Sequence, residues 1–216
     1  MNLYPVMMNL ENRLTLVIGG GSVAARKISD LFEAGAVVRV ISPDFVSEII
    51  EMNRKNPARI ELIQRRYVEG DLQGAVLVFS ATDNRDVNSA VYAEAEGMGI
   101  LVNAVDDPPN CSFYVPSFVR RGDLIFALST SGASPAMAAK LRRMLEETIP
   151  CEVDNMLKAL RRGREILKTD ESFRHMDTDC RGEILKRVVN DDDLLEKLSS
   201  CSCDSEIISF FKENSN

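Results

Sequence analysis

The sequence predicts an α/β protein built on a doubly wound parallel sheet, followed by a small α+β segment and a helical C-terminal domain. Three observations favour this fold class. Short apolar runs alternate with stretches of helical period over residues 1–112, and a glycine triplet separates the first apolar run from the first helix. Several apolar runs are nearly continuous, which suits a parallel sheet covered on both faces.

The elements of residues 1–112 follow one another in a regular order. The expected strands are 14–18, 37–41, 60–64, 76–81 and 101–104. The expected helices are 23–33, 45–54 and 86–96. Strands and helices at this spacing predict a Rossmann-type domain over residues 1–112.

Residues 113–150 differ in character. Two apolar runs flank a polar turn at 120–123, which predicts a hairpin, and Pro135 in the first turn begins a helix that runs to about Glu147. An isolated hairpin is marginal in water, so this segment needs a surface to pair with. A second copy of the chain is the natural candidate, which makes 113–150 a dimerisation segment. Residues 151–216 have a helical pattern and are expected to form the C-terminal helical domain.

Composition excludes several classes of protein. The chain has 216 residues and a net charge of −7, which argues against general nucleic-acid binding. No apolar run is long enough for a membrane span, and no secretory signal precedes the first strand. Five cysteines without metal-site spacing predict reduced thiols, no metal site and a cytoplasmic location. His175, the single histidine, is expected at the surface.

The glycine triplet predicts a ligand. It follows the first strand and opens the first helix in TLVIGGGSVAAR, residues 15–26. Gly19 suits the tight turn after the strand, Gly21 allows a pyrophosphate to approach the backbone, and Ala24 lets helix and strand pack closely. The helix N-terminus would present free N–H groups to the phosphates. The alternative is a tight turn in an α/β protein that binds no ligand.

The end of the second strand bears on which dinucleotide is bound. An acidic residue usually takes the ribose hydroxyls there, but Ser42 occupies the expected position and Asp44 follows two residues later. No arginine stands just past the strand to hold a 2′-phosphate. The pattern favours NAD over NADP.

Polar residues follow two more strands at the carboxyl edge of the sheet, where ligands bind in such folds. Thr82 and Asp83 follow strand 76–81 and are candidate cofactor contacts, although Asp83 or Asn84 could instead cap the next helix. Asp106 and Asp107 follow the last strand. Two adjacent carboxylates could include a general base or a metal ligand, or could lie in a solvated loop.

A loop rich in hydroxyls and glycine precedes the helix that begins at Pro135. Such a loop at a helix N-terminus can seat a carboxylate or a phosphate, and its alternative is a helix cap. Five basic and three acidic residues make 113–150 the only basic segment of the chain. The candidate substrate contacts in the loop are Thr130, Ser131, Gly132 and Ser134.

Together these segments resemble the precorrin-2 dehydrogenase modules of siroheme synthases. The similarity covers about residues 3–150 in order and spacing, and rests on YPVMMNLENRLTLVIGGGSVAARKISDLFEAGAVVRVISPDF, FSATDN, VNAVDD and FYVPSFVRRGDLIFALSTSGASPAMAAKLRRMLEE. The resemblance implies a homodimer that oxidises precorrin-2 to sirohydrochlorin with NAD. Some members also insert Fe(II) to give siroheme, and whether this chain does so stays open.

The resemblance also implies roles for individual residues. The essential aspartate of the family falls on Asp106, in a motif that begins at Asn103, a candidate substrate contact. A family serine in the hydroxyl loop falls on Thr130, which keeps the hydroxyl. Family contacts to NAD fall on Ser22, Val23, Pro43 and Asp44.

The substrate that the resemblance implies is a polyanion, which suits the basic segment and a helix N-terminus. The chain is too short to include the methyltransferase of longer siroheme synthases, so a separate protein is expected to supply precorrin-2. Three other interpretations stay open: a chelatase with little use for NAD, a nucleotide-sensing regulatory domain, and a dehydrogenase for another small substrate. A nucleotide-sensing domain needs no reactive group near the nicotinamide, so the presence of Asp106 argues against that interpretation. A dehydrogenase for another small substrate would leave the basic segment 113–150 unexplained.

Overall fold

The structure, a computed structural model, describes residues 2–214. The chain divides into two compact units, Tyr4–Val115 and a second unit made mostly of residues from Pro116 onward. Each unit has its own buried clusters and is described separately. The predicted domain boundaries at 112/113 and 150/151 remain predictions.

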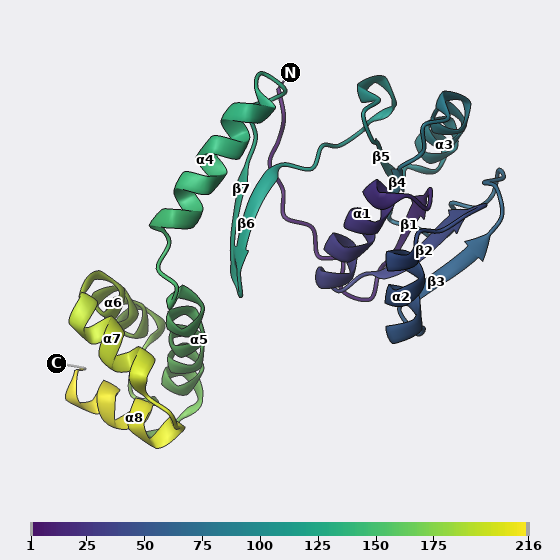
Figure 1. The fold of residues 1–216 in the computed structure, drawn as a ribbon. Helices are drawn as coiled ribbons and strands as arrows, with labels where there is room; N and C mark the ends of the chain where they lie inside the picture. The colour runs from purple at the N-terminus through teal and green to yellow at the C-terminus, as the bar shows by residue number, and fades with distance from the viewer. Residues whose placement is uncertain (1, 215–216) are drawn as a thin grey trace. The chain divides into compact units, whose positions relative to one another are not determined.

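The first unit is built on a five-stranded sheet (Figure 1). Its strands all run parallel in the order β3-β2-β1-β4-β5. The chain leaves β1 toward β2 and β3, and then returns to the other side of β1 for β4 and β5, so the fold is doubly wound as predicted. The strands are β1 (Leu14–Ile18), β2 (Val37–Ser42), β3 (Ile60–Gln64), β4 (Leu77–Ser80) and β5 (Leu101–Ala104).

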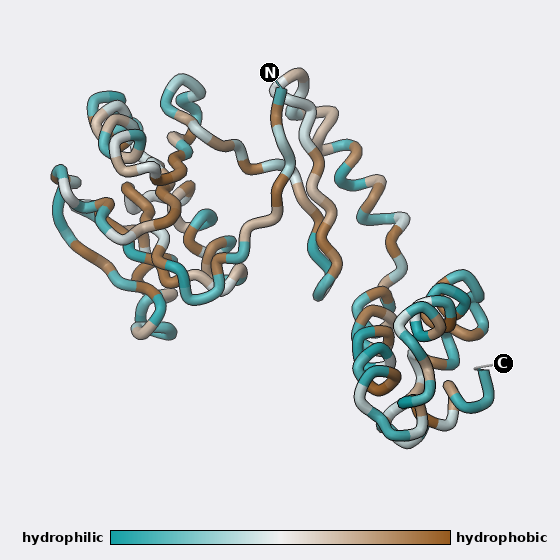
Figure 2. Tube along the Cα trace, turned by 180° about the vertical axis from the view of Figure 1, so that it is seen from behind, coloured by the Kyte–Doolittle hydropathy of each residue, from teal (hydrophilic) through white to brown (hydrophobic). Residues whose placement is uncertain are grey.

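Helices cover both faces of this sheet. The helical elements are α1 (Ser22–Glu33), α2 (Ser47–Lys55), α3 (Arg85–Met98) and a short 3-10 turn, η1 (Pro108–Asn110). Alternate strand residues bury toward opposite faces: Val17 joins the cluster of α1 and α2, whereas Leu16 and Ile18 join the cluster of α3. Figure 2 shows hydrophobic segments in the strands of this unit. The burial of their side chains on both faces confirms the covered parallel sheet.

The predicted elements of this unit are all present, with small shifts at their ends. The clearest shift is in α2, which begins at Ser47 rather than at residue 45. Val46 is its N-cap, and the Val46 N–H donates to the Gly20 carbonyl at 2.9 Å. The residues before α2 therefore belong to a loop that is bonded to the glycine turn.

The second unit begins with an antiparallel hairpin and a helix. These elements are β6 (Ser117–Arg121), β7 (Leu124–Leu128) and α4 (Pro135–Thr148). The Arg121 guanidinium caps the C-terminal end of α4, because it donates to the carbonyls of Glu146 (2.6 Å) and Ile149. Only Val119 and Ile149 are buried hydrophobic residues within 113–150, so this segment has almost no core of its own.

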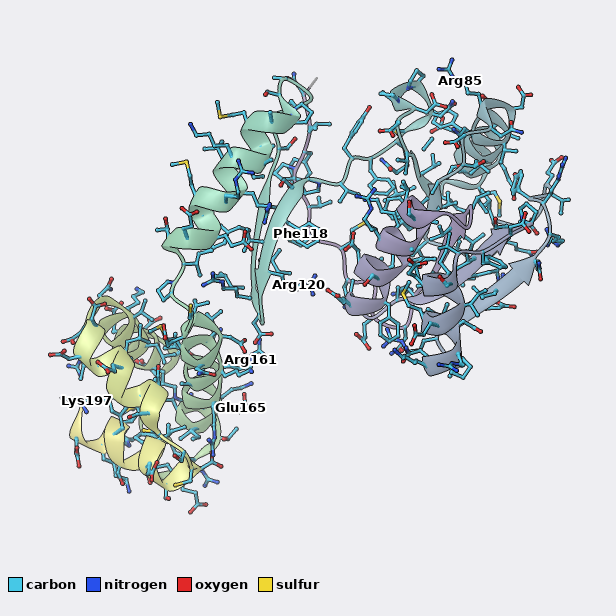
Figure 3. The ribbon with its side chains drawn as sticks, in the orientation of Figure 1. Arg85, Phe118, Arg120, Arg161, Glu165 and Lys197 are labelled. Atoms are coloured by element: carbon cyan, nitrogen blue, oxygen red, sulfur yellow. The ribbon has the colours of Figure 1, made fainter. Side chains whose placement is uncertain are left out.

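The rest of the second unit is helical. Its elements are α5 (Val153–Thr169), η2 (Glu171–Phe173), α6 (Thr178–Asn190), α7 (Asp192–Ser200) and α8 (Asp204–Glu213). These helices pack around Phe173 and Phe211, whose rings meet edge to face at a centroid distance of 6.2 Å. Arg161 of α5 reaches the hairpin turn, where its guanidinium lies 2.7 Å from the Asp123 carboxylate (Figure 3 labels Arg161).

Candidate functional site

The strand register of the first unit brings several loops to one edge of the sheet. Ile18 is paired with Ile41 and with Ser80, and Ser80 is paired with Ala104. The loops that follow β1, β2, β4 and β5 therefore begin side by side at the carboxyl edge. The glycine turn lies between the ends of β2 and β4, where the winding of the sheet reverses.

Gly19 and Gly20 press their backbone against the neighbouring loops. Gly19 has a φ of +121°, and a Cβ there would lie 2.2 Å from the Ala81 carbonyl oxygen. A Cβ on Gly20 would lie 2.0 Å from the Asp44 carbonyl oxygen and 2.8 Å from the Ser42 hydroxyl. Side chains at either position would collide with backbone, so both glycines are required for packing.

Gly21 differs from its two neighbours because a Cβ there would meet nothing within 4 Å. It is the N-cap of α1, and no side chain caps that helix. The first turn of α1 contains no acidic residue, so neither a side-chain cap nor a carboxylate of that turn competes with a ligand for its N–H groups. Behind them, Ala24 is fully buried against the sheet. This arrangement fits a bound pyrophosphate, which needs close backbone approach and free N–H donors.

Ser42, at the end of β2, is buried, whereas Pro43 and Asp44 are exposed. The nearby Arg39 is engaged with Glu61, with 2.7 Å between guanidinium Nε and carboxylate Oε2. The Asp44 side chain is thus the exposed acidic group after β2, and the arginine of β2 is already paired.

At the end of β4, the structure shows which residue caps the next helix. The Asn84 side chain is the N-cap of α3, because its Oδ1 accepts the N–H groups of Asp86 (3.0 Å) and Val87 (3.2 Å). Thr82 Oγ1 accepts the Asn84 N–H at 3.2 Å. Asp83 is exposed and takes no part in the cap.

The loop after β5 places Asp106 in an uncommon backbone conformation. Its φ is +59°, and the Asp107 N–H donates to the Ala104 carbonyl at 3.2 Å, which closes a turn around it. Glycine or asparagine usually occupies this place in such a turn. The Asp106 side chain is exposed, and its carboxylate has no hydrogen-bond or ion-pair partner within residues 2–214. The Asp106 carboxylate is therefore available to a ligand.

Asn103 lies on β5 and contacts the segment after the turn. Its Nδ2 donates to the Phe113 carbonyl at 2.9 Å and approaches Cys111 Sγ at 3.7 Å. The Cys111 thiol donates in turn to the Ala104 carbonyl at 3.1 Å. Burial raises the pKa of this thiol, and the Asp107 carboxylate adds to the increase, so the thiol keeps its proton at neutral pH. Both side chains fasten the loop together.

The hydroxyl loop belongs to the second unit. Ser134 caps α4, because its Oγ accepts the Met137 N–H at 3.2 Å. Thr130 Oγ1 accepts the Ser134 N–H at 3.2 Å, and Ser131 has a φ of +51°. Ser131 and Gly132 are exposed, so the loop is open to a ligand although part of its hydrogen bonding supports the helix cap.

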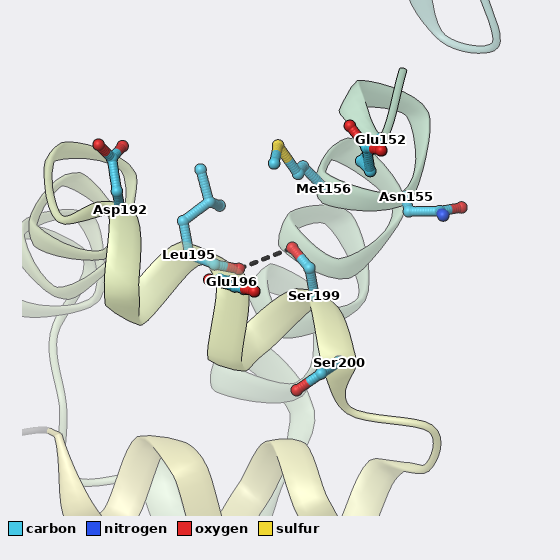
Figure 4. A pocket seen from close by; sticks show the side chains of 8 residues that line it. All are labelled: Glu152, Asn155, Met156, Asp192, Leu195, Glu196, Ser199 and Ser200. Carbon is cyan, nitrogen blue, oxygen red and sulfur yellow. Dashed lines mark hydrogen bonds between the residues drawn. The ribbon is translucent and has the colours of Figure 1, made fainter. Parts of the chain in front are cut away.

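A hollow of about 470 Å³ lies on the helical part of the second unit (Figure 4). Its lining includes three carboxylates and no basic residue, so it would repel an anion. The residues that line it are Glu152, Asn155, Met156, Asp192, Leu195, Glu196, Ser199 and Ser200. His175 is exposed.

Two absences among residues 2–214 concern metals and membranes. Within residues 2–214, no three or more His, Cys, Asp or Glu side chains gather as a metal site would require. Among the same residues, none of the helices combines the length and the apolarity needed to span a bilayer.

Two residues of this edge are not among the predicted site residues. One is Gly20, because nothing in the glycine triplet marks it as the glycine that packs against the β2–α2 loop. Asn88 is 3% exposed beside Asp107. Its signal was present, because Asn88 stands at helical spacing with the apolar residues Val91 and Ala95.

Comparisons with known proteins agree with this geometry. The model of a family described as "Putative NAD(P)-binding" matches residues 6–117, which is more than half of the chain. A solved structure titled "SirC, precorrin-2 dehydrogenase" aligns with a TM-score of 0.76 over 98% of each chain at 24% identity, which shows a shared fold.

Curated relatives are called siroheme synthase. The protein from Photorhabdus laumondii is 38% identical over 168 residues, or 78% of this chain and 35% of the relative. The one from Pseudoalteromonas translucida is 37% identical over 175 residues, or 81% of this chain and 36% of the relative. This chain thus spans about a third of the length of these relatives.

The turn at Asp106 yields a prediction about stability. Replacing Asp106 with Gly should leave the free energy of unfolding at or slightly above that of the wild type, because glycine adopts a positive φ without strain. Replacing it with Val should lower that free energy by about 1–2 kcal/mol. Urea titration of both variants measures the difference. Equal stability of the two variants would contradict the strained turn.

Proposed function

Because the chain belongs to the NAD(P)-binding family whose model covers more than half of it, we propose that it binds NAD and oxidises precorrin-2 to sirohydrochlorin. One observation carries the proposal. The glycine turn and the unpartnered carboxylate of Asp106 follow strands that end at the same sheet edge. A hydride acceptor and a proton acceptor are what such an oxidation requires.

The cofactor side of the proposal rests on the glycine turn. In this proposal, the pyrophosphate binds beside Gly21 at the uncapped start of α1, where Ser22 and Val23 supply the first N–H donors. We assign the adenosine ribose to the β2 end, where Asp44 is the exposed acidic group and Arg39 is held by Glu61. This favours NAD over NADP, since a 2′-phosphate would find a carboxylate instead of a free guanidinium.

The chemistry divides between the cofactor and the protein. When bound, NAD⁺ supplies the hydride acceptor for the reaction. The Asp106 carboxylate takes the proton that must leave the macrocycle when the hydride does, and its exposure lets a large substrate reach it. We assign Thr82 and Asp83 to contacts with the cofactor, because they follow β4, which pairs with β1 next to the glycine turn. Asn103 precedes the turn on β5 and bonds the Phe113 carbonyl, and we keep it as a candidate substrate contact.

The substrate side of the proposal rests on the charge of one segment. Precorrin-2 is a polyanion, and the segment 113–150 is the only basic part of an otherwise acidic chain. We assign its carboxylates to the loop before α4, formed by Thr130, Ser131, Gly132 and Ser134, where Ser131 and Gly132 are exposed. Fe(II) insertion, and a separate methyltransferase that supplies precorrin-2, remain predictions from the resemblance.

We further propose that the chain works as a homodimer. The hairpin and α4 expose Ile125 (37%), Phe126 (38%), Met137 (48%) and Met144 (51%), and α4 buries no residue. On β6, Phe118 and Arg120 are two residues apart and share the face opposite Val119, which is buried (Figure 3). A two-stranded sheet with so little core needs a partner surface, and a second copy offers a matching one.

An anaerobic assay tests the reaction. With precorrin-2 and NAD⁺, the wild type should form sirohydrochlorin, which absorbance follows, and a second stage with Fe(II) reports chelation. The Asp106→Ala variant should fold and bind NAD but lose turnover by about 100-fold or more, the size expected for a lost general base. Wild-type turnover in this variant would remove Asp106 from the mechanism.

The glycine turn yields a second test, by NADH fluorescence titration. Gly21→Asp should abolish NAD binding through steric block and charge repulsion at the pyrophosphate, while its unfolding midpoint stays near that of the wild type because the space around Gly21 is open. Gly20→Ala is the matched comparison. It should lower the free energy of unfolding by about 1–3 kcal/mol, because its methyl group meets backbone. Undiminished NAD affinity in Gly21→Asp would refute the phosphate assignment.

The dimer is tested by sedimentation velocity. Phe126→Glu should shift the chain from dimer to monomer, because a buried unpaired carboxylate opposes association. Val189→Glu is the control, since Val189 is 50% exposed on α6, away from the hairpin. A monomeric wild type, or equal effects of the two variants, would contradict the proposed interface.

A further inference from the structure

The turn that presents Asp106 is held in place by hydrogen bonds from residues outside the turn. Asp106 itself contributes only a strained backbone and an unpartnered carboxylate. Such a conformation persists only when the surrounding structure determines it. Asn103 and Cys111 fasten the loop on one side. Asp107 and the end of β4 supply a second set of contacts.

Two side-chain amides hold the Asp107 carboxylate. Asn110 Nδ2 donates to Asp107 Oδ2 at 2.9 Å, and Asn88 Nδ2 donates to the same oxygen at 3.3 Å. Asn110 lies in the same loop, so it moves with Asp107. Asn88 lies on α3, so its bond ties the loop to a rigid helix.

Asn88 is in turn fixed by β4. Its Oδ1 accepts the Ser80 hydroxyl at 2.7 Å in a buried pair, and its Nδ2 also reaches the Thr82 carbonyl at 3.4 Å. The Ser80 carbonyl accepts the Val105 N–H at 2.9 Å. Ser80 thus bonds the loop directly through its backbone and indirectly through Asn88.

Burial makes this network costly unless it is complete. Asn88 is 3% exposed and Ser80 is fully buried, on a helix face and a strand that are otherwise apolar. A buried amide without partners is destabilising, whereas alanine at position 88 would carry no such cost. The hydrogen bonds of Asn88 therefore explain why a buried amide occupies this position. Two of its partners, Ser80 and Thr82, belong to the end of β4, and the third, Asp107, belongs to the loop after β5.

We propose that Asn88 is a positioning residue for Asp106, acting through Asp107, and this rests on the proposed role of Asp106 as the proton acceptor. Asp107 serves as a hydrogen-bond acceptor for two amides and not as a second base. The two adjacent carboxylates thus have separate tasks: one reacts and the other anchors the turn.

The test compares Asn88→Ala with Asn53→Ala. Asn53 is a matched control because its amide donates to the Ile60 carbonyl at 2.6 Å, at the start of β3 and away from the carboxyl edge. We measure kcat and KM in the anaerobic assay, and hydrogen exchange of the backbone amides of residues 103–112. Asn88→Ala should lower kcat by about 10- to 100-fold with little change in KM for NAD, as expected for a misplaced reacting group.

Hydrogen exchange reports the positioning without any need for activity. Exchange over residues 103–112 should accelerate by about tenfold in Asn88→Ala and stay unchanged in Asn53→Ala. Unchanged exchange in Asn88→Ala, or faster exchange with an unchanged kcat, would overturn the proposal. If the wild type does not oxidise precorrin-2, the proposed function fails, and exchange still decides whether Asn88 holds the turn.

A rescue experiment separates hydrogen bonding from charge. Asp107→Asn keeps a side-chain oxygen that can accept from both amides, so its kcat should stay close to that of the wild type. Asp107→Ala should lose as much kcat as Asn88→Ala, and Asp106→Asn should lose activity because it removes the reacting carboxylate. If Asp107→Asn is as inactive as Asp107→Ala, then charge matters at position 107 and the proposal is wrong.

Discussion

The register of the five parallel strands is the constraint on which the candidate site depends. Because successive strands pair Ile18 with Ser80 and Ser80 with Ala104, the loops that leave them start side by side. A slip of one residue would turn the side chains of a strand to the opposite face. Both faces of this sheet are buried under helices, so packing fixes the register and, with it, the place of Asp106 relative to the glycine turn.

The glycine triplet serves two purposes that its sequence does not separate. Gly19 and Gly20 let the turn pack against the backbone of two neighbouring loops, at 2.2 Å and 2.0 Å from where a Cβ would stand. Gly21 alone faces open space at the start of α1. Packing of the first two glycines thus holds the third in the position where a phosphate can meet free N–H groups.

The adjacent aspartates show how surroundings give different tasks to the same residue type. Asp107 is partly buried and is bound by two amides, one of which is anchored in the core by Ser80. Asp106 is exposed, without a partner among the described residues, and held in a left-handed conformation. The backbone conformation of Asp106 is destabilising, and the hydrogen bonds around Asp107 offset this cost. Such a combination is typical of functional sites.

The sequence by itself determined the order and type of the elements, because hydrophobic period, glycines and caps are local properties of the chain. It also predicted the carboxyl edge of the sheet, the glycine turn and Asp106. Only the tertiary structure decided that Asn88 reaches Asp107, that Gly20 packs on Asp44, and that Arg39 is held by Glu61. These contacts join residues 19 to 24 positions apart, and the pairing of side chains at such separations depends on how strands and helices pack.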